Sequence, residues 1–116
     1  DRSHDLSTDS VVSLITKVIE KIQTESPRTK LYIQSLLPIN ESFGRYKTMT
    51  GKTDLIPEIN RKLEALAKEK KISFIHLFPL FTEKNSNVMR KELTTDGLHL
   101  TEEGYRIWSK ALKRYL

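Results

Sequence analysis

Two residues near the end of the chain have the types and spacing needed for acid–base chemistry. Asp96 precedes His99 by three positions, with Gly97 between them, in the stretch TTDGLHLTEEGYRIW, residues 94–108. A histidine acts as a general base near neutral pH when a neighbouring carboxylate fixes its tautomer and stabilises its charged form. A backbone turn at Gly97 lets the two side chains approach each other. The spacing therefore predicts an Asp–His pair, with Asp96 and His99 as candidate catalytic residues.

The same spacing also fits a purely structural role. The pattern D-x-x-H occurs by chance in many proteins, so Asp96 could cap a turn and His99 could be an ordinary surface histidine. On spacing alone this interpretation is the simpler one. The helices and strands around the pair are therefore needed to decide between the catalytic and the structural role.

The composition indicates a single folded domain with a modest core. The chain has 116 residues, and its hydrophobic content of 37% is near the average of globular proteins. No long apolar run predicts a transmembrane helix, so we expect no membrane partner. The N-terminus does not resemble a signal peptide. Secretion or export to the periplasm stays open, because a signal could have been removed or could lie outside this sequence.

Cysteine and histidine usage limits the metal chemistry. With no cysteine, the chain has no disulfide and no thiolate metal site. His4, His76 and His99 are far apart in the sequence and form no HxxxH-type pair. We therefore expect no metal site.

The chain is basic, with a net charge of +5. Its lysines fall mostly on the outer faces of predicted helices, as in RKLEALAKEKK and SKALKRYL, and they alternate with glutamates. This pattern is typical of a solvated basic surface. No motif of a known nucleic-acid-binding module is present, so we expect no nucleic-acid partner.

Hydrophobic periodicity predicts three helices and two strands. Three segments carry apolar residues at helical spacing, and two short, nearly uncharged apolar segments end at Pro38 and Pro79. Thr101 is the expected N-cap of the last helix, with Glu102 and Glu103 near its positive end. The expected order is a helix over 7–26, a strand over 29–38, a polar loop over 39–54, a helix over 54–71, a strand over 72–81, a loop or broken helix over 82–99 and a helix over 101–116.

Each predicted helix has an apolar stripe that should face the core. Ser7 or Thr8 is the expected cap of the first helix, and the second helix tolerates Pro57 in its first turn. The stripes consist of Val11, Leu14, Ile15, Val18, Ile19 and Ile22 in the first helix, Ile56, Ile59, Leu63, Leu66 and Ala67 in the second, and Tyr105, Trp108, Leu112 and Tyr115 in the last.

The order of the elements predicts an α/β fold. A strand, a helix and a second strand in succession indicate a right-handed βαβ unit with parallel strands. Two strands are few for a parallel sheet covered by helices on both faces. The first helix also has no strand before it. We therefore expect a piece of a larger doubly wound sheet, with a further strand upstream of Asp1.

The wider sequence resembles a known family. DGLHLTEEGYRIW follows KISFIHLFPLF and SPRTKLYIQSLLPIN in the order and spacing typical of the last part of the SGNH hydrolases, also called GDSL-type lipases and acylhydrolases. The resemblance implies a three-layer α/β/α sandwich with a parallel, flavodoxin-like sheet. Residues 1–116 would be the C-terminal portion of a single domain of this type.

The resemblance also implies an activity. Asp96 and His99 would be the acid and base of a Ser–His–Asp triad in an esterase. His99 would take the proton of a serine hydroxyl and later give it to the leaving alcohol, while Asp96 orients the imidazole. The substrate would be a small ester, such as a short acyl group on a carbohydrate, and no cofactor is implied.

The sequence departs from the family pattern at the nucleophile. The Gly-Asp-Ser block of the family is absent, as are the blocks that supply the glycine and asparagine of the oxyanion hole. Asp1 fits the final aspartate of the family's third block. We therefore expect the missing N-terminal half of the domain to be a required partner. Without it, the exposed sheet edge predicts a homo-oligomer or low stability.

Further residues were candidates for the site. Phe43, Arg45 and Tyr46 lie in the loop after the first strand, where α/β proteins place ligands, and are candidate substrate-binding residues. A solvent-exposed loop tip explains them equally well. Ser3 has no preceding glycine or strand-to-helix turn, so it is not the expected nucleophile. Structural roles are expected for Ser35, Asn60, His76 and Trp108.

Two other functions stay open from the sequence. The chain could be a non-catalytic α/β module that binds a partner through its basic face or sheet edge. It could also be another α/β hydrolase or a phosphate-binding domain in which Asp96 and His99 merely hold a loop.

Overall fold

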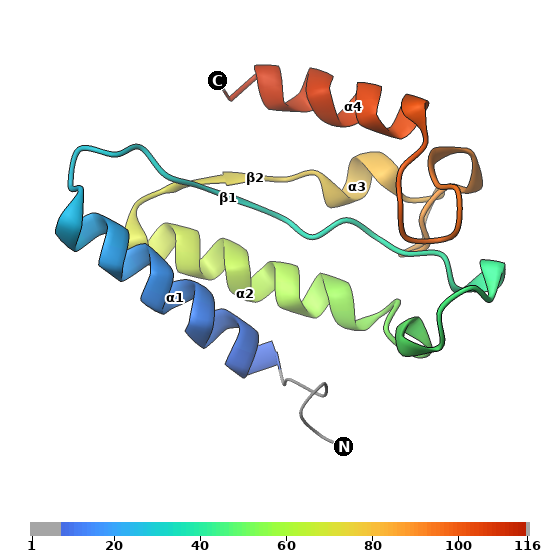
Figure 1. Ribbon diagram of the computed structural model, residues 1–116, viewed down its shortest axis with the longest axis horizontal. Helices are drawn as coiled ribbons and strands as arrows, with labels where there is room; N and C mark the ends of the chain where they lie inside the picture. The colour runs from blue at the N-terminus through green and yellow to red at the C-terminus, as the bar shows by residue number, and fades with distance from the viewer. Residues whose placement is uncertain (1–7, 116) are drawn as a thin grey trace.

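The computed structural model describes residues 8–115, in which helices lie on both sides of two parallel strands (Figure 1). Helices α1 and α2 lie on one side of the strands and α4 on the other, so the chain has the three layers expected. The elements are α1 (Thr8–Glu25), β1 (Tyr32–Gln34), α2 (Leu55–Lys70), β2 (Ser73–Ile75), α3 (Phe78–Phe81) and α4 (Glu102–Lys113), with short 3-10 turns at Glu41–Phe43, Lys47–Met49 and Lys91–Leu93.

The two strands pair in parallel, as the βαβ pattern predicted. Ile33 of β1 lies opposite Phe74 of β2, and α2 connects the strands. Side chains alternate between the two faces of a strand. Accordingly, Ile33 packs with α1 and α2, whereas Ile75 packs with α4. The sheet therefore separates two apolar cores.

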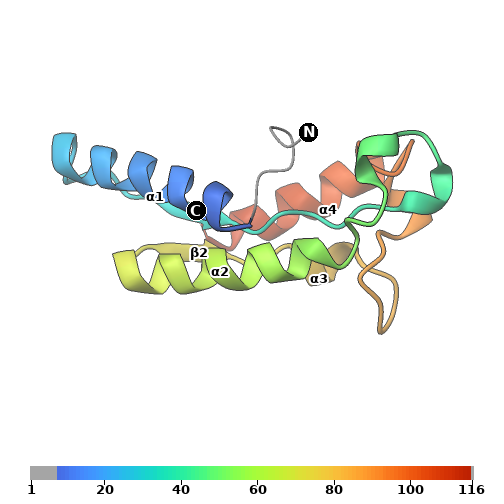
Figure 2. The ribbon, with the colours of Figure 1, turned by 90° about the horizontal axis from the view of Figure 1, so that it is seen from below.

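The first core lies between the strands and the helix pair α1–α2, which lie side by side (Figures 1 and 2). The stripe predicted for α2 is confirmed, because all five of its members are buried. In α1 the prediction is only partly right, since Leu14 and Val18 are 56% and 58% exposed.

The second core lies between the strands and α4. Thr101 caps this helix as predicted, by accepting a hydrogen bond from the Gly104 amide. The predicted burial of Tyr105 and Tyr115 is wrong, because these side chains are 51% and 36% exposed. The helix approaches so closely that a Cβ at Gly104 would lie 2.8 Å from the Leu93 carbonyl oxygen. Gly104 and Ala111 are the buried residues of α4, and Ile107, Trp108 and Leu112 pack partly buried against the same core.

The two strands are shorter than predicted. After β1, hydrogen bonds from side chains take the place of the backbone hydrogen bonds between the strands. The Ser35 hydroxyl accepts hydrogen bonds from the amides of Leu77 and Phe78, each at 3.0 Å. The Asn60 amide accepts from the Leu36 amide at 2.7 Å and donates to the Leu36 carbonyl at 3.2 Å. The structural roles predicted for Ser35 and Asn60 are thereby confirmed.

The second strand also ends earlier than predicted, and Pro79 has a different role. Pro79 lies in the first turn of α3 instead of closing a strand. Proline lacks an amide hydrogen, which the first turn of a helix does not require. The helix begins here because Ser35 satisfies the amides at its start.

An apolar groove of about 320 Å³ lies between α1 and β1. Among the described residues, β1 pairs only with β2, so its other edge is open beside this groove. The exposed side chains of Leu14 and Val18 lie on the α1 side of the groove, and Tyr32 and Ile33 on the β1 side.

None of the helices within residues 8–115 is long and apolar enough to cross a membrane.

Candidate active site

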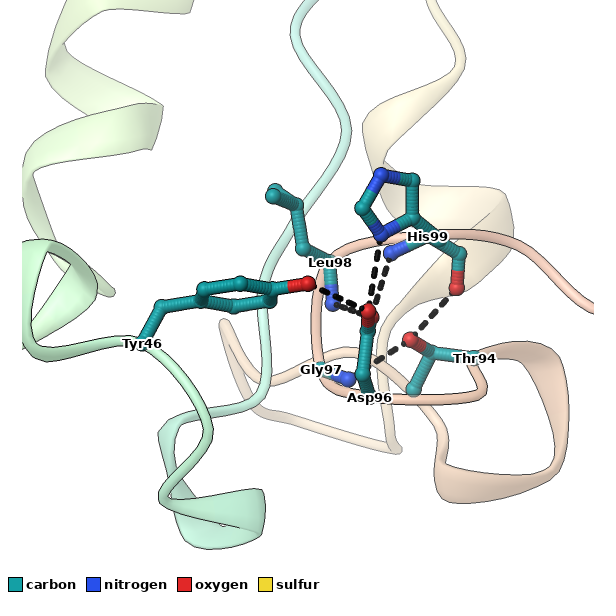
Figure 3. Close-up of polar contacts among 6 residues, drawn as sticks. All are labelled: Tyr46, Thr94, Asp96, Gly97, Leu98 and His99. Atoms are coloured by element: carbon teal, nitrogen blue, oxygen red, sulfur yellow. Dashed lines mark hydrogen bonds and ion pairs between the residues drawn. The ribbon is translucent and has the colours of Figure 1, made fainter.

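Asp96 and His99 form the pair that their spacing predicted. The Asp96 Oδ2 atom lies 2.8 Å from the His99 Nδ1 atom (Figure 3). The other carboxylate oxygen, Oδ1, accepts hydrogen bonds from the backbone amides of Leu98 at 2.9 Å and His99 at 2.8 Å. Three donors within one turn therefore surround the carboxylate.

Thr94 closes the loop that carries the pair. Its hydroxyl donates to the His99 carbonyl at 2.6 Å and accepts from the Gly97 amide at 2.9 Å. The Thr95 amide also donates to the His99 carbonyl, at 3.0 Å. The loop is thus fixed at both ends before α4 begins.

Two features of the structure require a glycine at position 97: its backbone conformation and the lack of room for a side chain. Its φ angle is +97°, in the region that favours glycine. A Cβ at this position would lie 2.3 Å from the carbonyl oxygen of Asn40, in the segment that follows β1. The backbone amide of Asn40 in turn donates to the Gly97 carbonyl at 2.9 Å. This contact fixes the Asp96 loop against the segment that follows β1.

Asp96 and His99 differ in their exposure. The Asp96 side chain is 14% exposed and the His99 side chain is 64% exposed. With Nδ1 facing Asp96, the Nε2 atom of His99 points away from the carboxylate (Figure 3). Nε2 is therefore available to a group that approaches from outside the loop. This is the arrangement that a general base needs.

The backbone hydrogen bond from His99 holds the pKa of Asp96 well below its usual range, and the contacts with the His99 imidazole, the Leu98 amide and the Tyr46 hydroxyl lower it further. Burial opposes this shift only in part. Asp96 therefore stays ionised at neutral pH and can stabilise a positive charge on His99.

The low pKa of Asp96 predicts a pH-dependent stability. The unfolded aspartate titrates near pH ~4, above its folded-state pKa, so the unfolded state binds more protons at acid pH. The contribution of Asp96 is present in full above that pH and is lost as the pH falls below it. We expect Asp96→Asn to lower the free energy of unfolding, measured by urea denaturation, at about pH 6 and to have less effect at about pH 3. An equal effect at both pH values would contradict this assignment.

Tyr46 reaches Asp96 from a separate segment of the chain. Its hydroxyl donates to Asp96 Oδ2 at 2.8 Å, and its ring lies edge-on to the His99 imidazole at 6.3 Å (Figure 3). The hydrogen bond to Asp96 raises the pKa of Tyr46. Of the three candidate substrate-binding residues, Tyr46 is the one that contacts the pair directly.

Phe43 and Arg45 lie in the same loop as Tyr46, but they do not bond to the pair. Phe43 is 39% exposed, and its Cβ lies close to Gly97. Arg45 is exposed, and its charge partly opposes the rise in the pKa of Tyr46 that the bond to Asp96 causes. Substrate binding by these residues stays a prediction.

Glu41 organises the loop that carries Tyr46. Its carboxylate accepts hydrogen bonds from the amides of Gly51 at 2.9 Å and Thr53 at 3.0 Å, and also from the Thr53 hydroxyl. These hydrogen bonds lower the pKa of Glu41, and the bond from the Thr53 hydroxyl has the largest effect. The Asn40 side chain caps the first turn of the loop by accepting from the Ser42 amide. Glu41 and Thr94 could not be predicted from the sequence as parts of the site, because only the folded loops bring them to their hydrogen-bond partners.

The remaining predicted residues lie away from the pair or outside the described part of the chain. Ser3 lies outside the described residues. His76 is exposed and contacts Phe74 through its ring. Trp108 is half-buried against the second core, and its indole donates to the Gln34 side chain at 3.1 Å.

Within residues 8–115, no serine is hydrogen bonded to the His99 imidazole. In the same range, no three His, Asp or Glu side chains are grouped so that they could hold a metal ion. The described residues thus present an acid–base pair and no bonded nucleophile.

The chain matches a known family over most of its length. Residues 1–107 match the model of the GDSL-like lipase/acylhydrolase family. The chain therefore belongs to this family, which has the SGNH hydrolase fold. None of the curated proteins compared with the chain matches it.

Several solved structures are similar to the chain. A Streptococcus pneumoniae protein named for platelet activating factor is 29% identical, with a TM-score of 0.85 over 99% of this chain and 54% of that chain. A GDSL-like lipase from Bacteroides thetaiotaomicron is 23% identical, with a TM-score of 0.79 over 94% and 52%. The esterase domain of the ORF1 protein of the zebrafish ZfL2-1 retrotransposon is 24% identical, with a TM-score of 0.74 over 93% and 61%. The chain thus spans about half the length of the first two.

Proposed function

We propose that this chain supplies the acid–base half of a serine esterase site of the GDSL type. The observation that carries the proposal is the 2.8 Å contact between Asp96 Oδ2 and His99 Nδ1, with Nε2 directed away from the carboxylate. Membership of an acylhydrolase family supports it. The proposed substrate is a small ester, such as a short acyl group on a carbohydrate.

The proposed reaction proceeds through an acyl-enzyme. His99 Nε2 accepts the proton of a serine hydroxyl as the serine oxygen attacks the ester carbonyl. The imidazolium then donates this proton to the departing alcohol, which leaves the acyl group on the serine. Water then attacks the acyl-enzyme and gives its proton to Nε2, and the imidazolium returns that proton to the serine oxygen as its bond to the acyl carbon breaks and the acid is released. Asp96 stabilises the imidazolium in both halves of the reaction.

The serine and the oxyanion hole are proposed to come from the rest of the same domain. The test compares two chains, residues 1–116 alone and a longer natural chain that contains the whole domain, for hydrolysis of p-nitrophenyl acetate. We expect turnover by the longer chain and none above background by residues 1–116. Failure of the longer chain to hydrolyse this or any other small ester would favour a non-catalytic binding module.

The α1–β1 groove is the proposed docking surface for that missing part. The open edge of β1 can accept a further parallel strand, and Leu14 and Val18 would then be covered. The occupant we propose is the preceding part of the same domain. The structural matches cover nearly all of this chain but only 54% and 52% of the first two solved chains. The apolar lining of the groove fits a buried strand better than solvent.

Val18→Lys tests this docking surface. We expect it to lower the free energy of unfolding of the longer chain by about 2 kcal/mol, because an apolar contact is lost. In residues 1–116 alone the change should stay within about 0.5 kcal/mol, since Val18 is already 58% exposed. Leu80→Lys, on an exposed side chain outside the groove, is the control and should act equally on both chains.

Equal small effects of Val18→Lys on both chains would contradict the docking proposal. A second copy of the chain is the other possible occupant. In that case residues 1–116 would sediment at twice their mass of 13.5 kDa, and Val18→Lys would restore the monomer.

A further inference from the structure

The Asp96 carboxylate has one donor that does not come from its own loop. The two amide bonds to Oδ1 and the imidazole contact at Oδ2 all lie within residues 96–99. The fourth donor is the Tyr46 hydroxyl, which lies 50 positions away in the sequence and bonds to Oδ2 at 2.8 Å. Oδ2 is the same oxygen that faces His99 Nδ1.

Rotation about the Cβ–Cγ bond of Asp96, whose torsional preference is broad, moves both carboxylate oxygens together, and the two amide bonds to Oδ1 restrain it from one side. The hydrogen bond from Tyr46 to Oδ2 comes from a separate segment and a different direction, and it restrains the same rotation further. Figure 3 shows the Tyr46 hydroxyl pointing at the carboxylate from across the loop.

The Tyr46 ring is itself held in place by packing. It lies half-buried against an apolar cluster formed by Ile39, Met49 and Ile56. The loop on either side is held by the hydrogen bonds of Glu41 to Gly51 and Thr53. The hydroxyl is therefore preorganised, and it orders Asp96 with little further loss of side-chain entropy.

We propose that Tyr46 is a positioning residue that directs Asp96 Oδ2 at His99 Nδ1 and so keeps the imidazole proton on Nδ1. This leaves Nε2 unprotonated and able to act as the base. Tyr46 acts through Asp96 and does not itself take part in the chemistry. The catalytic consequence of this inference rests on the proposed esterase function, whereas the geometric role does not.

The first test uses residues 1–116 and needs no activity. The 15N chemical shifts of the imidazole nitrogens report which one carries the proton, and recording them above the titration range of histidine isolates the neutral ring. The His99 signals are assigned by their absence in His99→Gln. We expect the Nδ1–H tautomer to dominate in the wild type and Tyr46→Phe to give a mixture of both tautomers.

Matched variants make this test specific. Tyr105→Phe removes the hydroxyl of an exposed tyrosine on α4 and should leave the His99 tautomer unchanged. Asp96→Asn removes the negative charge and replaces one acceptor oxygen with an NH2 donor, so it should abolish the preference for Nδ1–H. If Tyr46→Phe retains the same tautomer as the wild type, the positioning role is overturned.

A second measurement keeps the inference testable if Tyr46→Phe does not fold. The pKa of Tyr46, followed by NMR of its ring carbons, is raised in the wild type by the bond to Asp96. We expect Asp96→Asn to lower it. An unchanged pKa of Tyr46 in Asp96→Asn would show that the two side chains do not interact, and the inference would fail.

Kinetics of the longer chain then separate this inference from the proposed function. We expect Tyr46→Phe to lower kcat for p-nitrophenyl acetate about 10-fold with KM changed less than about 2-fold, as for loss of a hydrogen bond to a charged group. A large rise in KM with unchanged kcat would instead make Tyr46 a substrate-binding residue and overturn the inference. If the longer chain has no activity but Tyr46→Phe shifts the tautomer, only the proposed function fails.

Discussion

Replacing His99 with alanine is expected to abolish ester hydrolysis by the chain that contains the whole domain. The substitution removes the group that accepts the serine proton and returns it to the leaving alcohol. In serine hydrolases, losing one member of the triad costs on the order of 10⁴-fold or more in kcat. The measurement is the steady-state hydrolysis of p-nitrophenyl acetate by the wild type and the His99→Ala variant.

His76→Ala is the matched control for this prediction. His76 is also exposed, but it contacts Phe74 and not Asp96, so its loss should leave kcat within about 2-fold of the wild type. Because the His99 side chain is 64% exposed, its removal should change the free energy of unfolding by less than about 1 kcal/mol. Survival of activity in His99→Ala, with His76→Ala equally active, would contradict the proposed role of His99.

Replacing Gly97 with alanine is expected to give the largest loss of stability. The backbone at Gly97 has a φ of +97°, and a Cβ would lie 2.3 Å from the Asn40 carbonyl oxygen. If the segment at Asn40 and the Asp96 loop move apart to make room for the Cβ, the hydrogen bond from the Asn40 backbone amide to the Gly97 carbonyl is lost. We expect a loss of about 3–5 kcal/mol in the free energy of unfolding, measured by urea denaturation.

Gly51→Ala separates the two causes of that loss. Gly51 also has a positive φ, +78°, but a Cβ there would meet no atom within 4 Å. The variant should therefore show only the cost of the backbone conformation, about 1 kcal/mol. If both variants lose the same free energy of unfolding, the close contact of Gly97 with Asn40 does not contribute to the loss.

The parts of the fold that depend on local sequence were predictable. The apolar stripe of α2 follows the helical period, and its five predicted members are buried. The cap at Thr101 and the parallel pairing also follow from local chemistry and from the βαβ order. The contact between Asp96 and His99 was predictable for the same reason, because only three positions separate them.

The parts that depend on tertiary contacts were not predictable. The distance between α4 and Leu93 decides which residues of that helix are buried, and the sequence period alone favoured Tyr105. Pro79 was predicted to end a strand, but it lies in the first turn of α3, whose first amides are satisfied by Ser35 from a distant part of the sequence. Tyr46 was predicted as a candidate substrate-binding residue of the loop, but nothing in the sequence indicates that it reaches Asp96.

The exposed apolar side chains of α1 support the proposal that a further part of the domain covers the α1–β1 groove. The periodicity of α1 predicted burial of Leu14 and Val18, and the chain as described leaves both of them exposed. A helical stripe normally faces a core. We therefore interpret these side chains as the surface that the rest of the proposed domain covers.

The most direct test of the central claim is to react the longer chain with a fluorophosphonate and to locate the modified residue by peptide mass spectrometry. We expect one labelled serine, outside residues 1–116, and much slower labelling in the His99→Ala variant, because His99 is the proposed base that activates this serine. A label on a serine within residues 1–116, or a labelling rate that does not depend on His99, would contradict the proposal.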